Sequence, residues 1–472
     1  MKRNINHYHF LAAGLIFFLA SCRLQKEYQR PEIELPSKFE AIAFADTSSI
    51  ADIEWKQFFN DVTLQSLIEK GLNYNHDLQI ALRRIDIAKQ QLTQANALSL
   101  PEINLQLTGQ LNRPSNNSLN GLSLKNFVGK SYVENYNATV GASWEIDVWG
   151  KIKAQKGIAL TQYLQSYEGA RAVKTQLVAN IAQGYFNLLM LDKQLEIAKR
   201  NLALSDSFVI ATRLLKNAGL TNALAVQQAE SQKQSTALLI PQLEQNIAIQ
   251  ENALQQLTGQ LPGSIQRSLS LSDLKLPDQL NTGLPSAVVS RRPDVRSSEM
   301  ALMIATSQIG IAQANMYPAL NITAGGGLES FKASNWFNIP NSLFGLAAGS
   351  IAQPIFQRRQ LRSQYEIAKL QRDQTVITFK QSVLNAVTEV SNALVQMEKT
   401  KEQEKIAKAQ VDALFHAVSN AQFLFKSDMA NYLEVITAQY NALQAQLNLI
   451  YLRRQEWAAV IELYRSLGGG WK

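Results

Sequence analysis

Few side chains in this sequence combine the types and spacing that a metal site or a catalytic site needs. The chain has four histidines, His7, His9, His76 and His416, and a single cysteine, Cys22. His7 and His9 lie in the N-terminal signal segment described below, and neither His76 nor His416 has the carboxylate or cysteine spacing of a metal site. The sequence therefore predicts no metal, no cofactor and no catalytic residues, so we do not expect an enzyme.

Two further motifs could bind anions, and each also has a structural explanation. Gly325-Gly326-Gly327 lies inside a predicted strand, whereas a phosphate loop joins a strand to a helix, so close backbone approach explains it better. The stretch Arg291-Arg292-Pro293-Asp294-Val295-Arg296 could hold an anion through its arginines. Proline followed by an acid is also typical of a helix start, and we favour that structural role.

The residues before the single cysteine, Cys22, indicate its role. Lys2 and Arg3 precede an apolar run from Phe10 to Ala20, and Ser21-Cys22 follow. This order is typical of an export signal. A small-residue box that ends in a single cysteine resembles a bacterial lipoprotein signal, with Cys22 as the lipidated first residue of the mature chain. The alternative is an ordinary signal peptide.

Composition limits the other classes. The 472 residues carry a formal net charge of +8, but no block of like charge indicates nucleic-acid binding. Beyond the signal, no apolar run approaches the ~20 residues that a spanning helix requires. If the chain crosses a membrane, its strands must do so.

Two stretches alternate apolar and polar residues with period two, and each pairs with a returning strand. One begins after Pro101 and the other after Pro318, and their alternation is that of strands with one apolar face. Strands of about ten residues are long enough to cross a bilayer, although a half-buried soluble hairpin has the same pattern. The expected strands are about 102–113, 135–147, 319–331 and 342–353.

Long helices are predicted after each pair of strands in the sequence. From Lys151 to about Asn217 the apolar residues keep a three–four spacing, and no proline intervenes, which predicts a supercoiled helix on the order of 100 Å long. A similar helix is expected from about Phe356 to Lys426. Each turns back into a second helix, and we expect Pro241 to bend or break the first of these.

The plan occurs twice. Leu224, Val226 and Ala229 match Leu433, Val435 and Ala438, each 209 positions later, which indicates an internal duplication. The expected division is a signal peptide (1–21), a tether (22–54), a first repeat (55–260), a linker (261–290), a second repeat (291–467) and a C-terminal tail (468–472). Four strands cannot close a barrel, so we expect several copies to share one.

These features together resemble the TolC-like outer-membrane efflux channels, in the lipoprotein branch that serves resistance–nodulation–division pumps. The similar segments are residues 55–78, Ser143 to Lys151, Arg291 to Arg296, Ile309 to Ala312, Tyr317-Pro318 and Leu467 to Trp471. The resemblance implies a mainly α fold with a small β part. It also implies a homotrimer, in which four strands per chain form a 12-stranded outer-membrane β-barrel continuous with a periplasmic helical tunnel.

The same resemblance implies function and partners. The channel would passively export drugs or other small toxic compounds that an inner-membrane resistance–nodulation–division transporter delivers through a periplasmic adaptor. It would lie in outer-membrane lipid and bind no nucleic acid. A type I protein secretion conduit is the alternative.

The resemblance also implies that acidic residues close the periplasmic mouth, and here they are displaced. The usual position is Thr437, while Glu434 lies one helical turn earlier and Asp428 sits on the turn itself. The first turn has Ala225 where the second has Glu434. We expect Asp428 and Glu434 to form the pore constriction, although Asn431 and Glu434 also have the spacing of a capping box.

Overall fold

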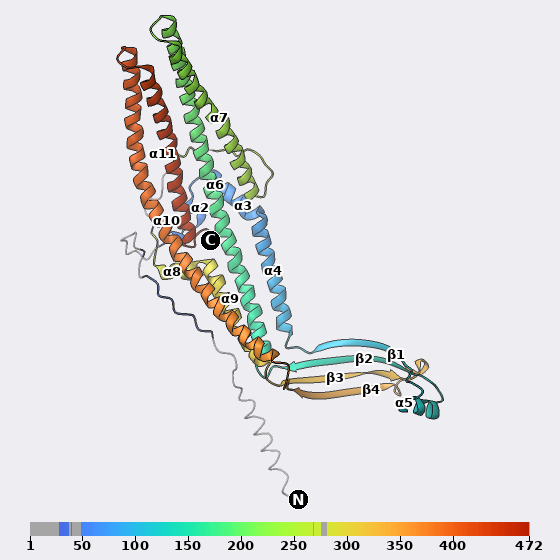
Figure 1. Cartoon of the computed structure of the whole chain (residues 1–472). Helices are drawn as coiled ribbons and strands as arrows, with labels where there is room; N and C mark the ends of the chain where they lie inside the picture. Colours follow the sequence, from blue (N-terminus) through green and yellow to red (C-terminus); the bar gives the residue numbers. More distant parts are fainter. Residues whose placement is uncertain (1–27, 37–38, 40–48, 268, 275–280, 472) are drawn as a thin grey trace. The chain divides into compact units, whose positions relative to one another are not determined.

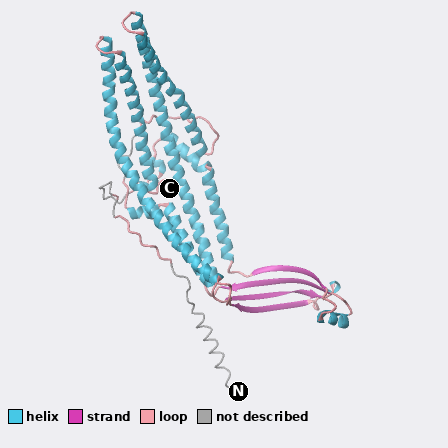
Figure 2. Ribbon diagram, in the orientation of Figure 1, coloured by secondary structure: helices cyan, strands magenta, loops and turns pink. Residues whose placement is uncertain are grey.

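The computed structural model describes residues 28–36, 39, 49–267, 269–274 and 281–471, which form two compact units. The first unit contains residues 86–164 and 300–377, and the second contains residues 32–85, 165–299 and 378–472. Figure 1 labels the elements, and Figure 2 separates helix from strand. The helices are α2 (Trp55–Phe58), α3 (Val62–Tyr74), α4 (His76–Ala97), α5 (Leu119–Ser123), α6 (Lys151–Asn217), α7 (Ala223–Leu257), α8 (Pro285–Arg291), α9 (Pro293–Ala314), α10 (Gln360–Lys426) and α11 (Tyr432–Ser466).

The first unit holds the sheet. Within the described residues its strands are β1 (Glu102–Asn112), β2 (Val133–Ile146), β3 (Ala319–Ser330) and β4 (Leu343–Ala352), all antiparallel in the order β1-β2-β3-β4. Helices dominate the rest of the described chain, so the predicted fold class, mainly α with a small β part, is confirmed.

The strand register gathers apolar residues on one face of the sheet. Ile103 lies opposite Ala142, and Leu105 lies opposite Val140. Directly opposite residues share a face, and the next pairings add Ala324 opposite Ala142 and Ala347 opposite Ala324. Ile103 and Leu105 are 70% and 67% exposed in the single chain, so nothing within its described part covers this face.

None of the described helices combines the length and apolarity needed to cross a membrane.

The duplication extends to element lengths. The helices α6 and α10 each have 67 residues, α7 and α11 each have 35, and α4 and α9 each have 22. Positions match 217 apart up to the first strand of each repeat (76 to 293) and 209 apart after the second strand (151 to 360). The difference lies in the strand connections, because the first one is longer and includes α5.

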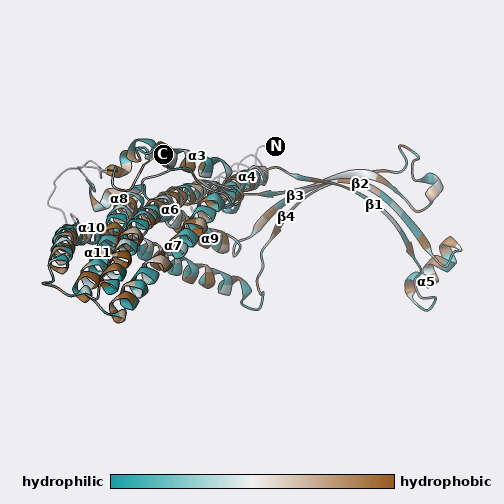
Figure 3. Ribbon diagram, turned by 90° about the horizontal axis from the view of Figure 1, so that it is seen from above, coloured by the Kyte–Doolittle hydropathy of each residue, from teal (hydrophilic) through white to brown (hydrophobic). Residues whose placement is uncertain are grey.

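The core of the second unit forms where the long helices meet. Leu188 and Ile181 of α6, Leu254 of α7, Val390 of α10 and Val460 of α11 are almost completely buried in one cluster. Figure 3 shows hydrophobic and hydrophilic residues interleaved along these helices, as expected for helices that each bury one stripe.

Asp61 begins a helix, whereas Pro241 does not end one. The segment from Trp55 to Asn75 contains two helices, α2 and α3, because Asp61 caps a new helix start. Its carboxylate accepts hydrogen bonds from the backbone N–H of Thr63 (2.7 Å) and Leu64 (3.0 Å). Pro241 does not break its helix, since α7 continues through it.

Candidate functional site

The two long hairpins turn through matching left-handed residues. Gly219 has φ +77° and Asp428 has φ +57°, and the two positions are 209 apart. At each turn the next backbone N–H reaches back into the preceding helix: Leu220 donates to Leu215 O and Met429 donates to Leu424 O, both at 2.9 Å. This bond is typical of a Schellman end, where glycine is the usual left-handed residue. In the second repeat aspartate fills that position.

An asparagine starts the returning helix in both repeats. Asn222 Oδ1 accepts from the N–H of Ala225 (3.0 Å), and Asn431 Oδ1 accepts from Leu433 (2.9 Å) and Glu434 (3.2 Å). Asparagine is a strong N-cap because its side chain satisfies N–H groups that have no partner inside the helix. The two turns therefore share one backbone design and differ in charge.

The acids expected at the pore constriction lie at the second turn. Asp428 and Glu434 are both exposed, and neither carboxylate takes part in a hydrogen bond or ion pair within the described parts of the chain. Asn431 itself caps α11, so the helix start does not depend on the Glu434 carboxylate. The lipid-attachment residue expected from the sequence, Cys22, lies outside the described residues.

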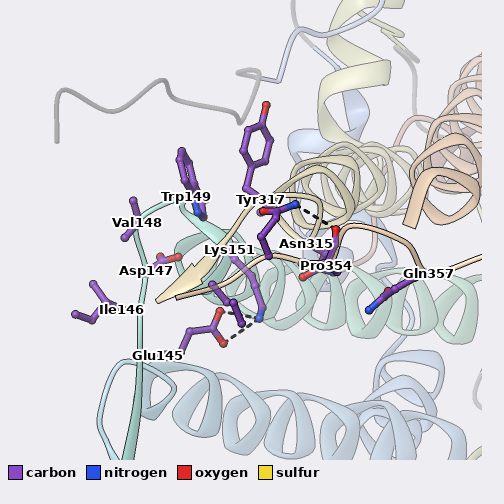
Figure 4. Close-up of a pocket in the computed structure, with 14 residues that line it drawn as sticks. Glu145, Ile146, Asp147, Val148, Trp149, Lys151, Asn315, Tyr317, Pro354 and Gln357 are labelled. Atoms are coloured by element: carbon purple, nitrogen blue, oxygen red, sulfur yellow. Dashed lines mark hydrogen bonds and ion pairs between the residues drawn. The ribbon is translucent and has the colours of Figure 1, made fainter. Parts of the chain in front are cut away.

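At the strand-to-helix junction of the first repeat, two acids fix the start of α6. Lys151 Nζ donates to both oxygens of Glu145, at 2.8 and 3.0 Å. The Asp147 carboxylate accepts from the backbone N–H of Ile152 (3.0 Å) and Lys153 (2.8 Å). Figure 4 shows these side chains around a hollow of about 410 Å³.

The same junction packs two sequence motifs together. Trp149 Nε1 donates to Pro318 O at 2.7 Å, and the Trp149 and Tyr317 rings lie 4.9 Å apart. In the sequence these residues belong to two separate segments of family resemblance. Through this contact the two aromatic residues hold the end of β2 against the start of β3.

The arginine stretch has a structural role, as favoured from its sequence. Arg292 is only 4% exposed, and its guanidinium makes a bidentate pair with Asp294 at 3.0 and 2.6 Å. It also donates to Glu389 (2.8 Å) and to the backbone carbonyl of Ser466 (3.1 Å). These partners join the start of α9 to α10 and to the end of α11.

Electrostatics stabilises the charges of this pair. Burial alone would lower the pKa of Arg292, but the hydrogen bonds and charges of Asp294 and Glu389 outweigh it and raise the pKa. Burial alone would raise the pKa of Asp294, but the bonded Arg292 outweighs it and lowers the pKa. Both groups stay ionised, and the Arg292 guanidinium is already occupied by partners inside the chain.

The neighbouring arginines are paired as well. Arg291 lies 3.0 Å from Asp52, and Arg296 lies 3.2 Å from the buried Glu168, which Arg171 also contacts at 2.9 Å. These pairs support the structural role of the stretch. Among the described residues no three His, Cys, Asp or Glu side chains gather closely enough to hold a metal ion.

Sequence reasoning missed two features. Arg358 and Arg359 have left-handed backbones, with φ +48° and +67°. Glu456 is 8% exposed and interacts with Glu404. The 209-residue offset could have indicated Arg359, because it matches this residue to Gly150, which is also left-handed. It gave no such signal for Arg358, whose counterpart is Trp149.

Comparison with known proteins agrees with this geometry. A family model described as outer membrane efflux protein matches residues 67–260 and 284–469. The cation efflux system protein CusC of Escherichia coli (strain K12) is 31% identical over 464 residues, which cover 96% of this chain and 97% of CusC. The probable outer membrane lipoprotein SilC of Salmonella typhimurium is 30% identical, covering 98% of both chains.

Other matches extend the comparison to a solvent pump and to a solved structure. The toluene efflux pump outer membrane protein TtgC of Pseudomonas putida is 28% identical, covering 96% of this chain and 94% of TtgC. A crystal structure of CusC superposes with a TM-score of 0.84 at 28% identity, covering 95% of this chain and all of that one. The chain thus belongs to the outer membrane efflux protein family, and it is a transport component of the outer membrane and not an enzyme.

Proposed function

We propose that the chain is the outer-membrane channel of a tripartite efflux system, through which drugs or other small toxic compounds leave the cell passively. The observation that carries this proposal is the duplicated plan of strand pair and long hairpin in a member of an efflux family. A channel fold with no catalytic requirement needs its energy from a pump. The expected pump is a resistance–nodulation–division transporter of the inner membrane, reached through a periplasmic adaptor.

The sheet supports a shared barrel. In the described chain β1 and β4 are the outer strands of the sheet, and each has one edge without a partner strand. Unpaired edges are unfavourable in lipid, where each backbone polar group needs a partner. Three copies would join these edges into a 12-stranded barrel, with a periplasmic tunnel made of the long helices.

The orientation of the strands can be tested directly. Ile103, Leu105, Val140 and Ala142 share a face, and we propose that it contacts lipid, while Asn104 and its polar neighbours line water. Single cysteines can be placed on a background that lacks Cys22 and treated with a charged thiol reagent. Faster reaction at the apolar set would reverse the assigned face.

The mature chain is proposed to begin at a lipid-modified Cys22. A tether of residues 22–54 would then link the acyl chains to the first repeat. SilC carries the word lipoprotein in its name, which supports this reading. Mass spectrometry of the mature N-terminus should find acyl chains on Cys22, and an unmodified N-terminus would contradict the anchor.

At the periplasmic mouth, Asp428 and Glu434 are proposed to form the constriction. In a trimer three copies of each would surround the axis, so that the mouth would favour cations. Their exposure and lack of partners within the described chain support this role.

Deleting the gene and measuring susceptibility tests the whole proposal. We expect the deletion strain to become more sensitive to at least one small toxic compound, and the full-length gene to restore resistance. The panel should contain metal cations together with toluene and antibiotics, because CusC is named for cations and TtgC for toluene. A membrane pull-down should recover an adaptor and a resistance–nodulation–division transporter.

The alternative is the outer-membrane conduit of a type I protein secretion system. Loss of a secreted protein from the medium, with unchanged susceptibility to every compound, would favour it. Co-purification of an ATP-driven transporter in place of the expected pump would support the same conclusion.

A further inference from the structure

The second strand-to-helix junction shares one left-handed position with the first but differs from it in side-chain chemistry. Residues 354–363 match residues 145–154 at the 209-residue offset, so Arg359 (φ +67°) occupies the place of Gly150 (φ +77°). Arg358 is also left-handed, at φ +48°. A residue with a side chain loses roughly 1 to 2 kcal/mol in this conformation. Two adjacent left-handed arginines therefore lower the stability of the folded chain, unless another interaction offsets this loss.

The contacts that close the first junction cannot form in the second. Glu145 and Lys151 pair in the first, whereas their counterparts are Pro354 and Gln360. Asp147 caps α6, and its counterpart is Phe356. The second junction therefore lacks these internal partners.

Three arginines of this junction are open to solvent. Arg358, Arg359 and Arg362 are exposed, and their side chains make no hydrogen bond or ion pair within the part of the chain that the structure describes. They also lie at the start of α10, where the helix dipole disfavours positive charge. No hydrogen bond or ion pair inside the described chain offsets these costs, which favours an interaction with something outside it.

The residues before the arginines are apolar and open. Ile355 is 95% exposed and Phe356 is 84% exposed, and they follow the end of β4 at Ala352 after two intervening residues. The order along the chain is strand, apolar pair, arginines. Side chains at a bilayer boundary follow this order, with apolar groups toward the acyl region and cations among the headgroups.

We infer that Arg358, Arg359 and Arg362, with Ile355 and Phe356, bind anionic phospholipid headgroups at the periplasmic surface of the outer membrane. This inference rests on the proposed function, which places β4 in that membrane. The guanidinium fork fits phosphate oxygens in pairs, which a lysine does not do. The open apolar pair adds acyl-chain contact, so the ligand is a lipid and not free phosphate.

The direct test titrates the purified full-length channel in detergent with phosphatidylglycerol, phosphatidylethanolamine and inorganic phosphate. Bound lipid is counted by native mass spectrometry, and thermal stability is recorded in parallel. We expect phosphatidylglycerol to bind and to raise Tm, and the other two to do neither. The triple variant Arg358→Gln/Arg359→Gly/Arg362→Gln should lose at least tenfold in affinity, at roughly fivefold for each charge near a lipid surface.

Matched variants separate lipid binding from folding. Lys153 is the first-repeat counterpart of Arg362, so Lys153→Gln should leave phosphatidylglycerol affinity within about twofold while Arg362→Gln lowers it by roughly fivefold. Arg359→Gly relieves the left-handed backbone, and we expect a higher Tm without lipid together with weaker binding. This variant keeps the test decisive if the triple variant fails to fold.

An unchanged phosphatidylglycerol affinity in the triple variant and in Arg359→Gly would overturn the inference. So would dissociation of the trimer at every lipid concentration, because the arginines would then pair with a neighbouring subunit. Membrane fractionation and bilayer conductance test the proposed function separately. A channel that conducts but binds no phosphatidylglycerol contradicts only this inference.

Discussion

The two repeats anchor their hairpins in the same place with different side chains. Asn75 precedes α4, and its Nδ2 donates to the carbonyl of Leu257, the last residue of α7, at 2.9 Å. Arg292 precedes α9, and its Nη1 donates to the carbonyl of Ser466, the last residue of α11, at 3.1 Å. Both donors are buried, with 6% and 4% exposure.

The two donors, Asn75 and Arg292, differ in their other hydrogen-bond partners. Asn75 completes its bonding by capping α4 through Leu78 N–H at 3.0 Å. Arg292 also holds Asp294 and Glu389, and Glu389 accepts in turn from Arg465 at 2.9 Å. Both repeats thus contain a buried side chain that donates to the last carbonyl of the returning helix. In the second repeat this donor also belongs to a network of charged side chains.

The charged anchor should be the more sensitive of the two. Arg292→Ala removes a buried cation and leaves two carboxylates and one carbonyl without it, so we expect a loss of roughly 2 to 4 kcal/mol in unfolding free energy. Asn75→Ala should cost about 1 to 2 kcal/mol, the value of one cap and one buried bond. Urea unfolding of the detergent-solubilised chain measures both, and an equal loss would contradict the comparison.

The repeats should also differ in how pH affects them. Burial, followed by the charge of Glu404, raises the pKa of Glu456 to about 7, whereas its first-repeat counterpart is Ile247. The folded chain holds this proton more tightly than the unfolded chain, whose carboxyl has a pKa near 4.5. Unfolding free energy should therefore fall as the pH rises from about 4.5 to about 7.

Glu456→Gln tests that slope. The amide cannot ionise, so we expect the change in stability between pH 5 and pH 8 to shrink by roughly 1 to 2 kcal/mol. Lys401 and Arg453 lower the same pKa, so Lys401→Gln should enlarge the slope. A slope that is identical in wild type and Glu456→Gln would show that this carboxyl does not titrate in the range.

A smaller effect is expected at the hairpin turns. Gly219→Ala places a side chain at φ +77° and should cost about 1 kcal/mol, while Asp428→Gly should gain a similar amount. Thermal melts would record the two shifts in opposite directions. A loss in Asp428→Gly would mean that the carboxylate stabilises its turn.

The smallest effect on folding is expected at Glu434, whose carboxylate has no partner within the described residues. Glu434→Gln should change stability by less than about 0.5 kcal/mol, because Asn431 caps the helix. Its conductance in planar bilayers should rise or lose cation preference, most clearly together with Asp428→Asn. Wild-type conductance with a lower Tm would instead favour the capping role and closure by packing.

Sequence patterns predicted the fold class well because strand alternation, proline positions and long three–four spacing are local signals. They failed where tertiary contacts decide. Asp61 begins a new helix within the Trp55–Asn75 segment, and Tyr185 from α6 donates to its carboxylate at 2.8 Å. For the site, the turn acids followed from the family resemblance, but two partners of Arg292, Glu389 and Ser466, lie 97 and 174 residues away. No local pattern encodes such distant contacts.

The contact between Tyr464 and Ile53 has a consequence for the order of assembly. The Tyr464 hydroxyl donates to Ile53 O at 2.8 Å across 411 residues, and its ring stacks on Phe58 at 4.1 Å. Contacts so far apart in sequence form late, because most of the chain must be available first. An exported chain emerges with its N-terminal end first, so the segment around Phe58 waits without its aromatic partner until translocation is almost complete. During that interval the Phe58 ring lacks the ring that it stacks on, and deleting the last ten residues, which include Tyr464, would make that state permanent.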